Sequence, residues 1–434
     1  MTVPLDRGTF NGTGPFCQEI VSQSARLIAC HECAAVYRRA PIPPHATASC
    51  KRCGAELYRH IPDSLNHSLA YYLAALMLWC MANIYPFLGL KVGAIYHENL
   101  LLAGGLALYE NGMGELGLVV FLTSIVFPFI TIAGMIYLLL PLRFNVIAPA
   151  TGRVYQIVRV LEPWSLVSVF MLGTLISIVK LQDLATVVPG LSLAAFAGLL
   201  FVYALARSSF DPESFWEKLE SLAGTMTQPG EHDPTHPLLQ CHICEGLQAS
   251  GHHCLRCGAA VHHRIEDSIQ QTWALLAAAT VMLVPANLFP VMTVNQLGKG
   301  NPDTIISGII HLMEAGLFGL GLIVLFASII VPFAKLGSLA FLLWSVQSNS
   351  DWRPRDRTQL YRVTEWVGAW SMVDVFLVGL LAGLVSLGLL ANVTPGIGAS
   401  FFGAAVILTM LAAHQFDPRL IWDRAGSNRV VAHE

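Results

Sequence analysis

The sequence predicts an all-α polytopic membrane protein in which a four-helix transmembrane unit is duplicated in tandem and each copy is preceded by a small cytoplasmic zinc ribbon. Three observations support this prediction: a shortage of charge, apolar blocks of membrane-spanning length, and two cysteine quartets in corresponding places. Hydrophobic residues make up 54% of the 434 residues and charged residues 12%, and the mean hydropathy is +0.58. Because a soluble domain carries about 25% charged residues, most of this chain is expected inside a bilayer.

Eight apolar segments are predicted to span the membrane as helices. Each is close to the roughly 20 residues that cross the hydrocarbon core. They cover residues 68–88, 118–140, 164–181, 191–205, 272–292, 317–346, 370–390 and 397–413. An even number of spans places both termini on the same side of the membrane.

The distribution of lysine and arginine predicts which side that is. Cytoplasmic segments carry an excess of these residues, and here they gather around the cysteine quartets, after the second and sixth spans and in the C-terminal tail. The opposite loops hold little more than Lys91 and Lys299. Residues 1–60 also lack the apolar run of a secretory signal. The ribbons and both termini are therefore expected in the cytoplasm.

The two halves repeat one another at an offset of 204 residues. This offset aligns Cys50–Ala55 with Cys254–Ala259, and it also pairs the prolines of the second and sixth spans, Pro128 with Pro332. After a two-residue slip Trp164 aligns with Trp370, and both copies close on a Phe-Asp-Pro motif. With four spans each, the copies are expected to be parallel repeats related by an axis along the membrane normal. The alternative is a pseudo-dimer whose symmetry has no meaning for transport.

The predicted domain boundaries follow from the repeat. They are an N-terminal tail (1–25), zinc ribbon 1 (26–62), transmembrane unit 1 (63–210), a linker (211–236), zinc ribbon 2 (237–266), transmembrane unit 2 (267–416) and a C-terminal tail (417–434).

Eight of the ten cysteines form C-x-x-C pairs, two pairs in each copy. Four thiolates from two such pairs complete a tetrahedral site that suits Zn(II), and cytoplasmic cysteines are rarely joined in disulfides. The predicted ligands are Cys30, Cys33, Cys50 and Cys53 in the first ribbon and Cys241, Cys244, Cys254 and Cys257 in the second. We expect two structural zinc ions, with iron as the alternative metal. The neighbouring His31, His242, His252 and His253 are expected to be solvated, because four sulfurs already fill each site.

Ionisable residues inside the spans form a predicted polar centre. A charge at mid-bilayer costs about 2.5–3.5 kcal/mol or more, so each needs a reason. Lys335 in the sixth span is expected to pair with Asp374 in the seventh. Their predicted polar neighbours are Ser328, Ser371 and Thr409. Lys180 and Asp183, near the outer end of the third span, form a second candidate pair. The alternatives are static salt bridges that fix helix register, or side chains that snorkel to the interface.

Other functions are disfavoured by the sequence. The formal net charge is −3 and the basic residues are scattered, which argues against nucleic-acid binding. No phosphate-binding loop, Ser-His-Asp arrangement or H-E-x-x-H pattern is present. The chain is therefore not expected to be an enzyme, and closed four-sulfur sites make a redox function the least favoured of the classes.

Several motifs together resemble a known family. They are the two ribbons, the helix ends Asn83-Ile84-Tyr85-Pro86 and Asn287-Leu288-Phe289-Pro290, and the repeated motifs Phe210-Asp211-Pro212 and Phe416-Asp417-Pro418. From Arg26 to Arg424 the chain resembles the paraquat-inducible protein A family.

The resemblance implies an inner-membrane component of a Gram-negative intermembrane lipid transport system. Its implied substrate is phospholipid, and its implied partner is a periplasmic MCE-domain protein, for which the outer loops 90–117 and 293–316 are the expected platform. Proton coupling through the Lys/Asp centre is a further hypothesis. The alternative function is a zinc-stabilised scaffold or sensor that anchors an envelope assembly without transporting.

Overall fold

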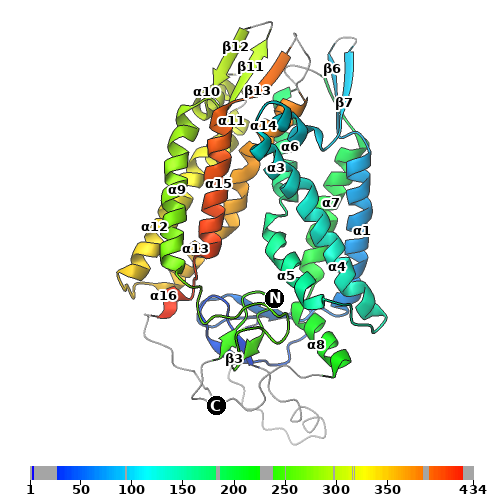
Figure 1. Cartoon of the computed structure of the whole chain (residues 1–434), viewed down its shortest axis with the longest axis vertical. Coiled ribbons are helices and arrows are strands. Elements are labelled where there is room, and N and C mark those ends of the chain that lie inside the picture. The colour runs from blue at the N-terminus through cyan, green and yellow to red at the C-terminus, as the bar shows by residue number, and fades with distance from the viewer. Residues whose placement is uncertain are drawn as a thin grey trace, which may run out of the picture.

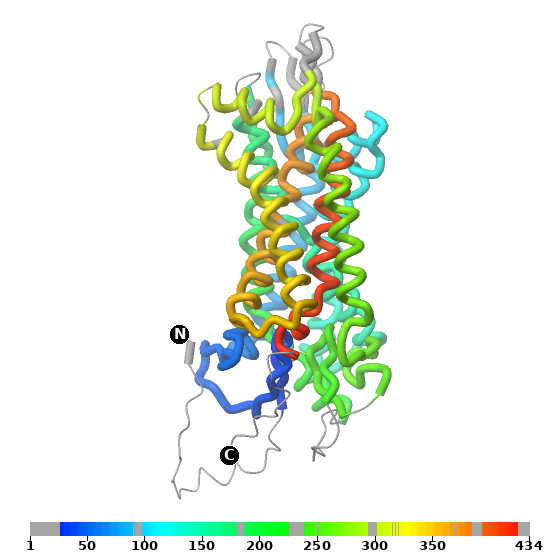
Figure 2. The backbone as a smooth tube through the Cα atoms, turned by 90° about the vertical axis from the view of Figure 1, so that its left-hand side faces the viewer, coloured from blue at the N-terminus to red at the C-terminus, as the bar shows by residue number. Residues whose placement is uncertain are grey.

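The computed structural model describes residues 2–3, 27–92, 95–181, 186–224, 238–249, 251–296, 299–314, 316, 318–384 and 391–423. The fold is mostly helical, in two halves that stand side by side (Figure 1). The ribbons lie at one end of the helices, here called the ribbon end, and small β-sheets lie at the other, here called the strand end (Figures 1 and 2).

The long helices of the first half are α1 (Ser64–Ile84), α3 (Gly114–Phe121) continuing into α4 (Phe127–Arg143), α5 (Thr151–Leu161) continuing into α6 (Val167–Leu181), and α7 (Leu191–Ser209). Those of the second half are α9 (Ser268–Leu288), α11 (Phe318–Leu325) with α12 (Val331–Gln347), α13 (Pro354–Gly368) with α14 (Val373–Leu384), and α15 (Ile397–Gln415). Shorter helices are α2 (Ala103–Glu110), α8 (Pro212–Ala223), α10 (Ile305–Glu314) and α16 (Leu420–Asp423).

Within the described residues, eight helical segments are long and apolar enough to cross a membrane, which agrees with the eight predicted spans. The third and seventh were predicted too short, because they begin at Thr151 and Pro354. In each, an amphipathic helix with several arginines runs through a short 3-10 turn, Glu162–Trp164 or Ala369–Met372, into the apolar segment. The hydropathy pattern therefore missed about the first half of both helical segments.

The strand end contains two three-stranded antiparallel sheets that were expected as loops. One has the order β7-β6-β8 and the other β12-β11-β13. Their strands are β6 (Leu88–Val92), β7 (Ile95–Asn99), β8 (Thr186–Pro189), β11 (Met292–Gln296), β12 (Lys299–Asp303) and β13 (Ala391–Pro395). The last strand of each sheet leads into the fourth span of its half, so each sheet connects the first and fourth spans at the strand end.

The ribbons are built from short strands. Those of the first are β2 (Leu27–Ala29), β3 (Val36–Arg38), β4 (Thr47–Ser49) and β5 (Glu56–Arg59), with β1 (Thr2–Val3) beside β4, and those of the second are β9 (Leu239–Gln240) and β10 (Leu247–Gln248).

The duplication is visible in individual hydrogen bonds at the ribbon end. Ser64 Oγ donates to the carbonyl of Ser209 (2.8 Å) and accepts from the backbone N–H of Asp211 (2.8 Å). This joins the start of α1 to the end of α7 at the Phe-Asp-Pro motif. The second half makes the same bonds, at 2.7 and 3.0 Å, with Ser268, Gln415 and Asp417.

Proline reshapes the second span of each half in the same way. Pro128 and Pro332 lack the N–H that an α-helix would use to bond the carbonyl four residues earlier. One turn of π-helix stands before each proline, at Leu122–Val126 and Phe326–Ile330. Such single turns of wider helix are frequent at functional sites, and the second one contains the predicted site residue Ser328.

The halves meet through α6 and α14, which lie between the two bundles (Figure 1). Phe170 on α6 stacks edge-to-face on Phe376 of α14, with 5.3 Å between ring centroids. Helix α2 of the first half packs on α14 through glycines, as expected for a G-x-x-x-G contact. A Cβ at Gly104 would lie 3.2 Å from the carbonyl oxygen of Gly379, and one at Gly383 would lie 2.8 Å from the Gly104 Cα.

The second half departs from the symmetry at this point. Helix α10 is the counterpart of α2, but among the described residues it packs mainly on its neighbour α11 and makes no comparable contact with α6. Gly308, the equivalent of Gly104, has no described atom within 4 Å of its Cβ position. The space left beside α10 is a pocket.

Candidate metal centres and transmembrane polar centre

The four C-x-x-C turns share one backbone geometry. In each, the carbonyl of the first cysteine accepts from the N–H of the residue directly after the second cysteine, and the N–H of the first cysteine donates to the carbonyl of the next residue, at 2.7–3.0 Å. The residue after the second cysteine has positive φ, which glycine adopts readily at Gly54 (77°) and Gly258 (78°). Ala34 (57°) and Glu245 (58°) adopt the same conformation in the other two turns, where it is less favourable for a side chain.

These turns bring the eight cysteines into two buried clusters that could each hold a metal ion. In the first, the sulfurs of Cys30 and Cys53 are 3.4 Å apart and those of Cys33 and Cys50 3.5 Å. The corresponding pairs of the second cluster are separated by 3.6 and 3.4 Å. All eight thiols are free. The only possible ligands within each cluster, among the described residues, are its four sulfurs, so the nearby histidines are not part of either site.

The thiols of one cluster ionise unequally. Hydrogen bonding to Cys33 raises the pKa of Cys30, whereas hydrogen bonding from Cys30 lowers the pKa of Cys50. The second cluster repeats this division, with the pKa of Cys244 raised and that of Cys254 lowered. The pKa values of Cys53 and Cys241 are also lowered, so each cluster combines two thiols of lowered pKa with two of raised pKa. The thiolate is the form that binds metal.

The first ribbon docks on the second half of the chain. Arg362 of α13 donates to the Cys53 carbonyl (2.9 Å) and forms a two-bond ion pair with Glu32. Burial opposes ionisation of Glu32, but hydrogen bonds from His31 and Arg362 hold its pKa below the usual value. In addition the guanidinium of Arg52 lies 4.5 Å from the ring of Trp422. Figure 2 shows the blue ribbon below the yellow and orange helices.

The second ribbon docks on the first half. Gln156 of α5 donates to the Cys257 carbonyl (2.5 Å), and α5 comes so close that a Cβ at Gly152 would lie 2.6 Å from the same oxygen. Arg256 bonds Glu220 (2.9 Å) and Glu213 (3.1 Å) of α8. Each ribbon therefore precedes one half in the chain and packs on the other half, and no sequence pattern predicts this arrangement.

The polar centre was predicted around Lys335 and Asp374. Both are buried, with 4% and 7% of their surfaces exposed. Their direct ion pair is not formed: within the described part of the chain Lys335 Nζ has no hydrogen-bond partner. Instead Lys335 points at the backbone of Gly368 on α13, where a Cβ would lie 2.6 Å from Nζ. Asp374 follows six residues later, about 9 Å further along the span.

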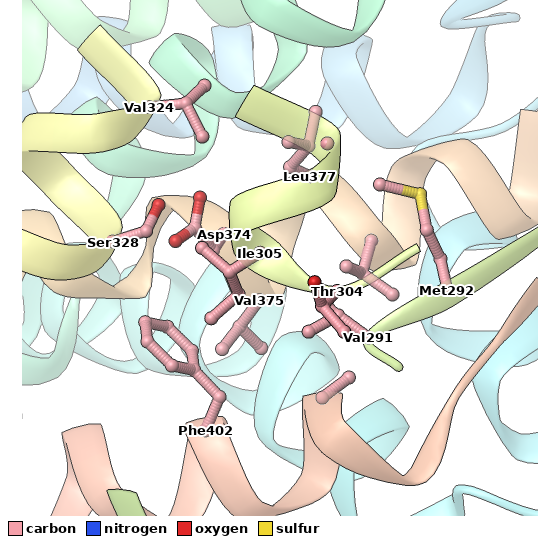
Figure 3. A pocket seen from close by; sticks show the side chains of 13 residues that line it. Val291, Met292, Thr304, Ile305, Val324, Ser328, Asp374, Val375, Leu377 and Phe402 are labelled. Carbon is pink, nitrogen blue, oxygen red and sulfur yellow. The ribbon is translucent and has the colours of Figure 1, made fainter. Parts of the chain in front are cut away.

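Asp374 and Ser328 line the pocket beside α10 (Figure 3). The space within the pocket, including open solvent at its mouth, is about 500 Å³, and apart from Thr304 its other walls are apolar, with Ile305, Val324, Leu377 and Phe402 among them. Ser328 Oγ is buried and has no hydrogen-bond partner in the described structure. The pocket therefore combines an apolar interior with one carboxyl group and two hydroxyl groups, those of Ser328 and Thr304.

The remaining predicted polar residues are placed as follows. Ser371, 1% exposed, lies in the 3-10 turn before α14, and its hydroxyl has no described partner. Thr409 on α15 is buried and donates to the carbonyl of Val406 on its own helix (2.8 Å). The Lys180 side chain and Asp183 lie outside the described residues. Gly368 was not predicted from the sequence as the residue that Lys335 contacts. Its alignment with Glu162 could have drawn attention to it, because the two copies differ there.

Comparison with known proteins agrees with this geometry. The family model described as "Paraquat-inducible protein A" matches twice, at residues 65–220 and 269–426. The chain is 30% identical over 409 residues to the Escherichia coli "Intermembrane transport protein PqiA", covering 92% of this chain and 96% of that one. It is 30% identical over 399 residues to the E. coli "Lipophilic envelope-spanning tunnel protein A", covering 91% and 90%.

A Haemophilus influenzae "Probable intermembrane transport protein" is 28% identical over 414 residues, covering 93% and 97%. No solved structure matches the chain. These relatives are named as transport proteins rather than enzymes. With two matched copies of the family domain, eight candidate spans and a four-cysteine cluster before each copy, the chain is a multi-span membrane protein that belongs to the paraquat-inducible protein A family.

Proposed function

We propose that this protein is an inner-membrane subunit of an intermembrane phospholipid transport system and that the pocket beside α10 is where lipid binds. The pocket carries the proposal, because its apolar walls suit acyl chains while Asp374 and Ser328 offer two polar contacts. It lies towards the strand end, between α10, α11, α14 and α15. The names of the relatives, which refer to intermembrane transport and to an envelope-spanning tunnel, support the same direction.

The proposed orientation places the ribbon end in the cytoplasm and the strand end in the periplasm. Its support is the positive-inside rule. Arg143, Arg153, Arg353 and Arg355 lie in or next to the connections at the ribbon end, whereas the connections that form the sheets contain few basic residues. The pocket would then open on the periplasmic side of the membrane.

A periplasmic MCE-domain protein is the proposed partner, and the two sheets are its proposed platform. Within the described residues the outer strands of each sheet pair on one side only, and such edges can pair with strands of another chain. Photo-crosslinkers at Tyr96 in β7 and Asn301 in β12, whose side chains lie outside the described part, should capture the partner. Capture only from the ribbons would contradict this placement.

Zinc is the proposed metal of both clusters. Four sulfurs at 2.3 Å from one tetrahedral ion would be about 3.8 Å apart, close to the 3.4–3.6 Å observed between the paired sulfurs. The clusters are buried and supply no ligand other than sulfur. A zinc ion there would have no open coordination position, so its proposed role is structural.

Proton coupling is proposed to involve Lys335 and Asp374 as two separate buried groups. An ionisable group in the membrane interior is costly and usually functional. The two groups are not in contact, so protonation would not act by breaking one ion pair. A change of protonation at Asp374 in the pocket would instead be coupled to Lys335 beside α13 through the helices that join them.

Lipid binding can be tested by placing a photoreactive phenylalanine analogue at Phe402, which lines the pocket, in cells with labelled phospholipid. We expect a lipid adduct from position 402 and none from Phe196, which is equally buried in the first half but lines no described pocket. Gly308→Trp should place its side chain in the pocket, because no described atom lies within 4 Å of the Gly308 Cβ position, and should abolish the adduct. An adduct that persists in the Gly308→Trp variant would exclude the pocket as the lipid site.

The second candidate function, a zinc-stabilised scaffold, is favoured by the ribbon contacts that tie the halves together. It predicts no pocket adduct and an intact envelope assembly when Gly308→Trp is the only form present. Loss of lipid transfer with an intact assembly favours the transporter.

A further inference from the structure

The contacts of both ribbons with the opposite halves repeat one another. Gln156 and Arg362 occupy equivalent positions on α5 and α13, and each donates a hydrogen bond to the carbonyl of the last cysteine of a quartet. In both cases that cysteine belongs to the ribbon that precedes the other half. Both copies keep this hydrogen bond to the ribbon although the residue that donates it differs, glutamine in one and arginine in the other. This indicates that the bond itself has a function.

Packing around these bonds joins each ribbon to the opposite half over a larger area. The four cysteines of the first ribbon share a hydrophobic cluster with Leu339 and Leu343 of α12 and with Trp422. Those of the second ribbon share a cluster with Tyr155 and Trp216. Because a small ribbon has little core of its own, much of its apolar surface is buried only when the opposite half is in place.

We infer that Gln156 and Arg362 are positioning residues for the metal sites, so that each ribbon keeps its metal through a contact with the opposite transmembrane half. Hydrogen bonds around a metal site orient the ligands, and their loss typically costs 10- to 100-fold in metal affinity. Here the bond fixes the turn that carries Cys53 or Cys257. This inference requires metal at the clusters but not lipid transport, so it can fail independently of the proposed function.

The contact also connects the first ribbon with the pocket. Helix α13 continues through the turn Ala369–Met372 into α14, which carries Asp374. By thermodynamic reciprocity, if docking of α13 strengthens metal binding at the first ribbon, then metal binding holds α13 in its docked position to the same degree. Metal in the first ribbon would thus stabilise the arrangement of the helix that lines the pocket.

The experiment compares metal retention at the two ribbons in the full-length protein in detergent. A zinc chelator is added, the cysteines are alkylated over time, and the modified peptides of each ribbon are quantified by mass spectrometry. Arg362→Ala should expose the cysteines of ribbon 1 about 10- to 100-fold faster and leave those of ribbon 2 unchanged. Gln156→Ala should do the reverse.

Two further variants separate positioning from general destabilisation. Arg362→Gln should retain much of the protection, because glutamine makes the equivalent contact at position 156. Arg39→Ala removes ion pairs that join ribbon 1 to Glu213 and Glu217 of its own side and should have little effect on metal release. Equal exposure of both ribbons in Arg362→Ala, or equal effects of Arg39→Ala and Arg362→Ala, would overturn the inference.

The reciprocal effect has its own measurement. Spin labels carried on unnatural amino acids at the exposed positions Trp366 of α13 and Phe201 of α7 report the distance between the halves. Chelation should change this distance distribution in the unsubstituted protein and should add nothing in Arg362→Ala. A distance that does not respond to chelation would contradict the coupling.

Discussion

Lys335 Nζ occupies the space in which a side chain at Gly368 would stand, 2.6 Å from the position of its Cβ. The first half has Thr131 and Glu162 at the equivalent positions. There Glu162 is half-buried and pairs with Arg207 at 2.7 Å. The duplication has thus exchanged an ion-paired carboxylate for a glycine that admits a buried ammonium group.

Gly368→Ala should displace the Lys335 ammonium and impair lipid transport more than folding. Overpacking typically costs about 1–3 kcal/mol, and the flexible lysine chain can absorb part of it. Transport in cells and the thermal unfolding midpoint in detergent measure the two effects. Gly337→Ala on α12 is the control, because no described atom lies within 4 Å of its Cβ position. Equal transport by both variants would show that the position of the ammonium does not matter.

Lys335→Met and Asp374→Leu should each abolish transport, and so should the double variant. Because Lys335 is not an ion-pair partner of Asp374, their effects on the free energy of unfolding should add to within about 0.3–0.5 kcal/mol, as for independent sites. A double-mutant cycle measures this. Larger coupling would indicate a direct pair in another state of the protein, and wild-type transport by the double variant would refute proton coupling.

Gly104→Leu and Gly308→Leu test the asymmetry between α2 and α10. The first places a side chain against the backbone of α14, 3.2 Å from the Gly379 oxygen already at Cβ, and should destabilise the protein by several kcal/mol. The second enters open space in the pocket and should leave the unfolding midpoint nearly unchanged while reducing transport. Similar destabilisation by both would mean that α10 packs as α2 does.

Purified protein should contain two zinc ions per chain, as elemental analysis can determine. Cys50→Ser should lower the amount of folded protein, because thiolate–zinc binding contributes folding free energy. Cys80→Ser is the matched control, since Cys80 is exposed and belongs to neither cluster. Two iron atoms per chain would support the alternative metal, and fewer than two metal ions in well-folded protein would refute the prediction.

Acid should weaken the junction between the second ribbon and α15. Burial opposes ionisation of Asp417, but hydrogen bonds from Arg419 and the Ile265 N–H hold its pKa below the ordinary 3.8. A lowered pKa contributes stability that is present above the ordinary value and is lost as the pH falls below it. Unfolding midpoints measured between pH 7 and pH 3 should therefore converge for the unsubstituted protein and Asp417→Asn. A constant gap down to pH 3 would contradict this assignment.

Much of this architecture could be predicted because its causes are local. The eight spans follow from apolar length, the cysteine turns from C-x-x-C spacing with Gly54 and Gly258, and the duplication from a fixed offset. Burial of Lys335 and Asp374 also followed from their position inside apolar segments. These features depend on residues close in sequence, so a linear reading captures them.

The tertiary structure decided what depends on contacts between distant residues. Nothing in the sequence around Cys53 indicates that Arg362 will bond its carbonyl, because the partner lies 309 positions away. Likewise, opposite charge alone predicted that Lys335 pairs with Asp374, but the Lys335 side chain on α12 points towards Gly368. The helices and their apolar length are local consequences of composition, whereas the docking of the ribbons on opposite halves and the opening beside α10 are set by packing between distant segments.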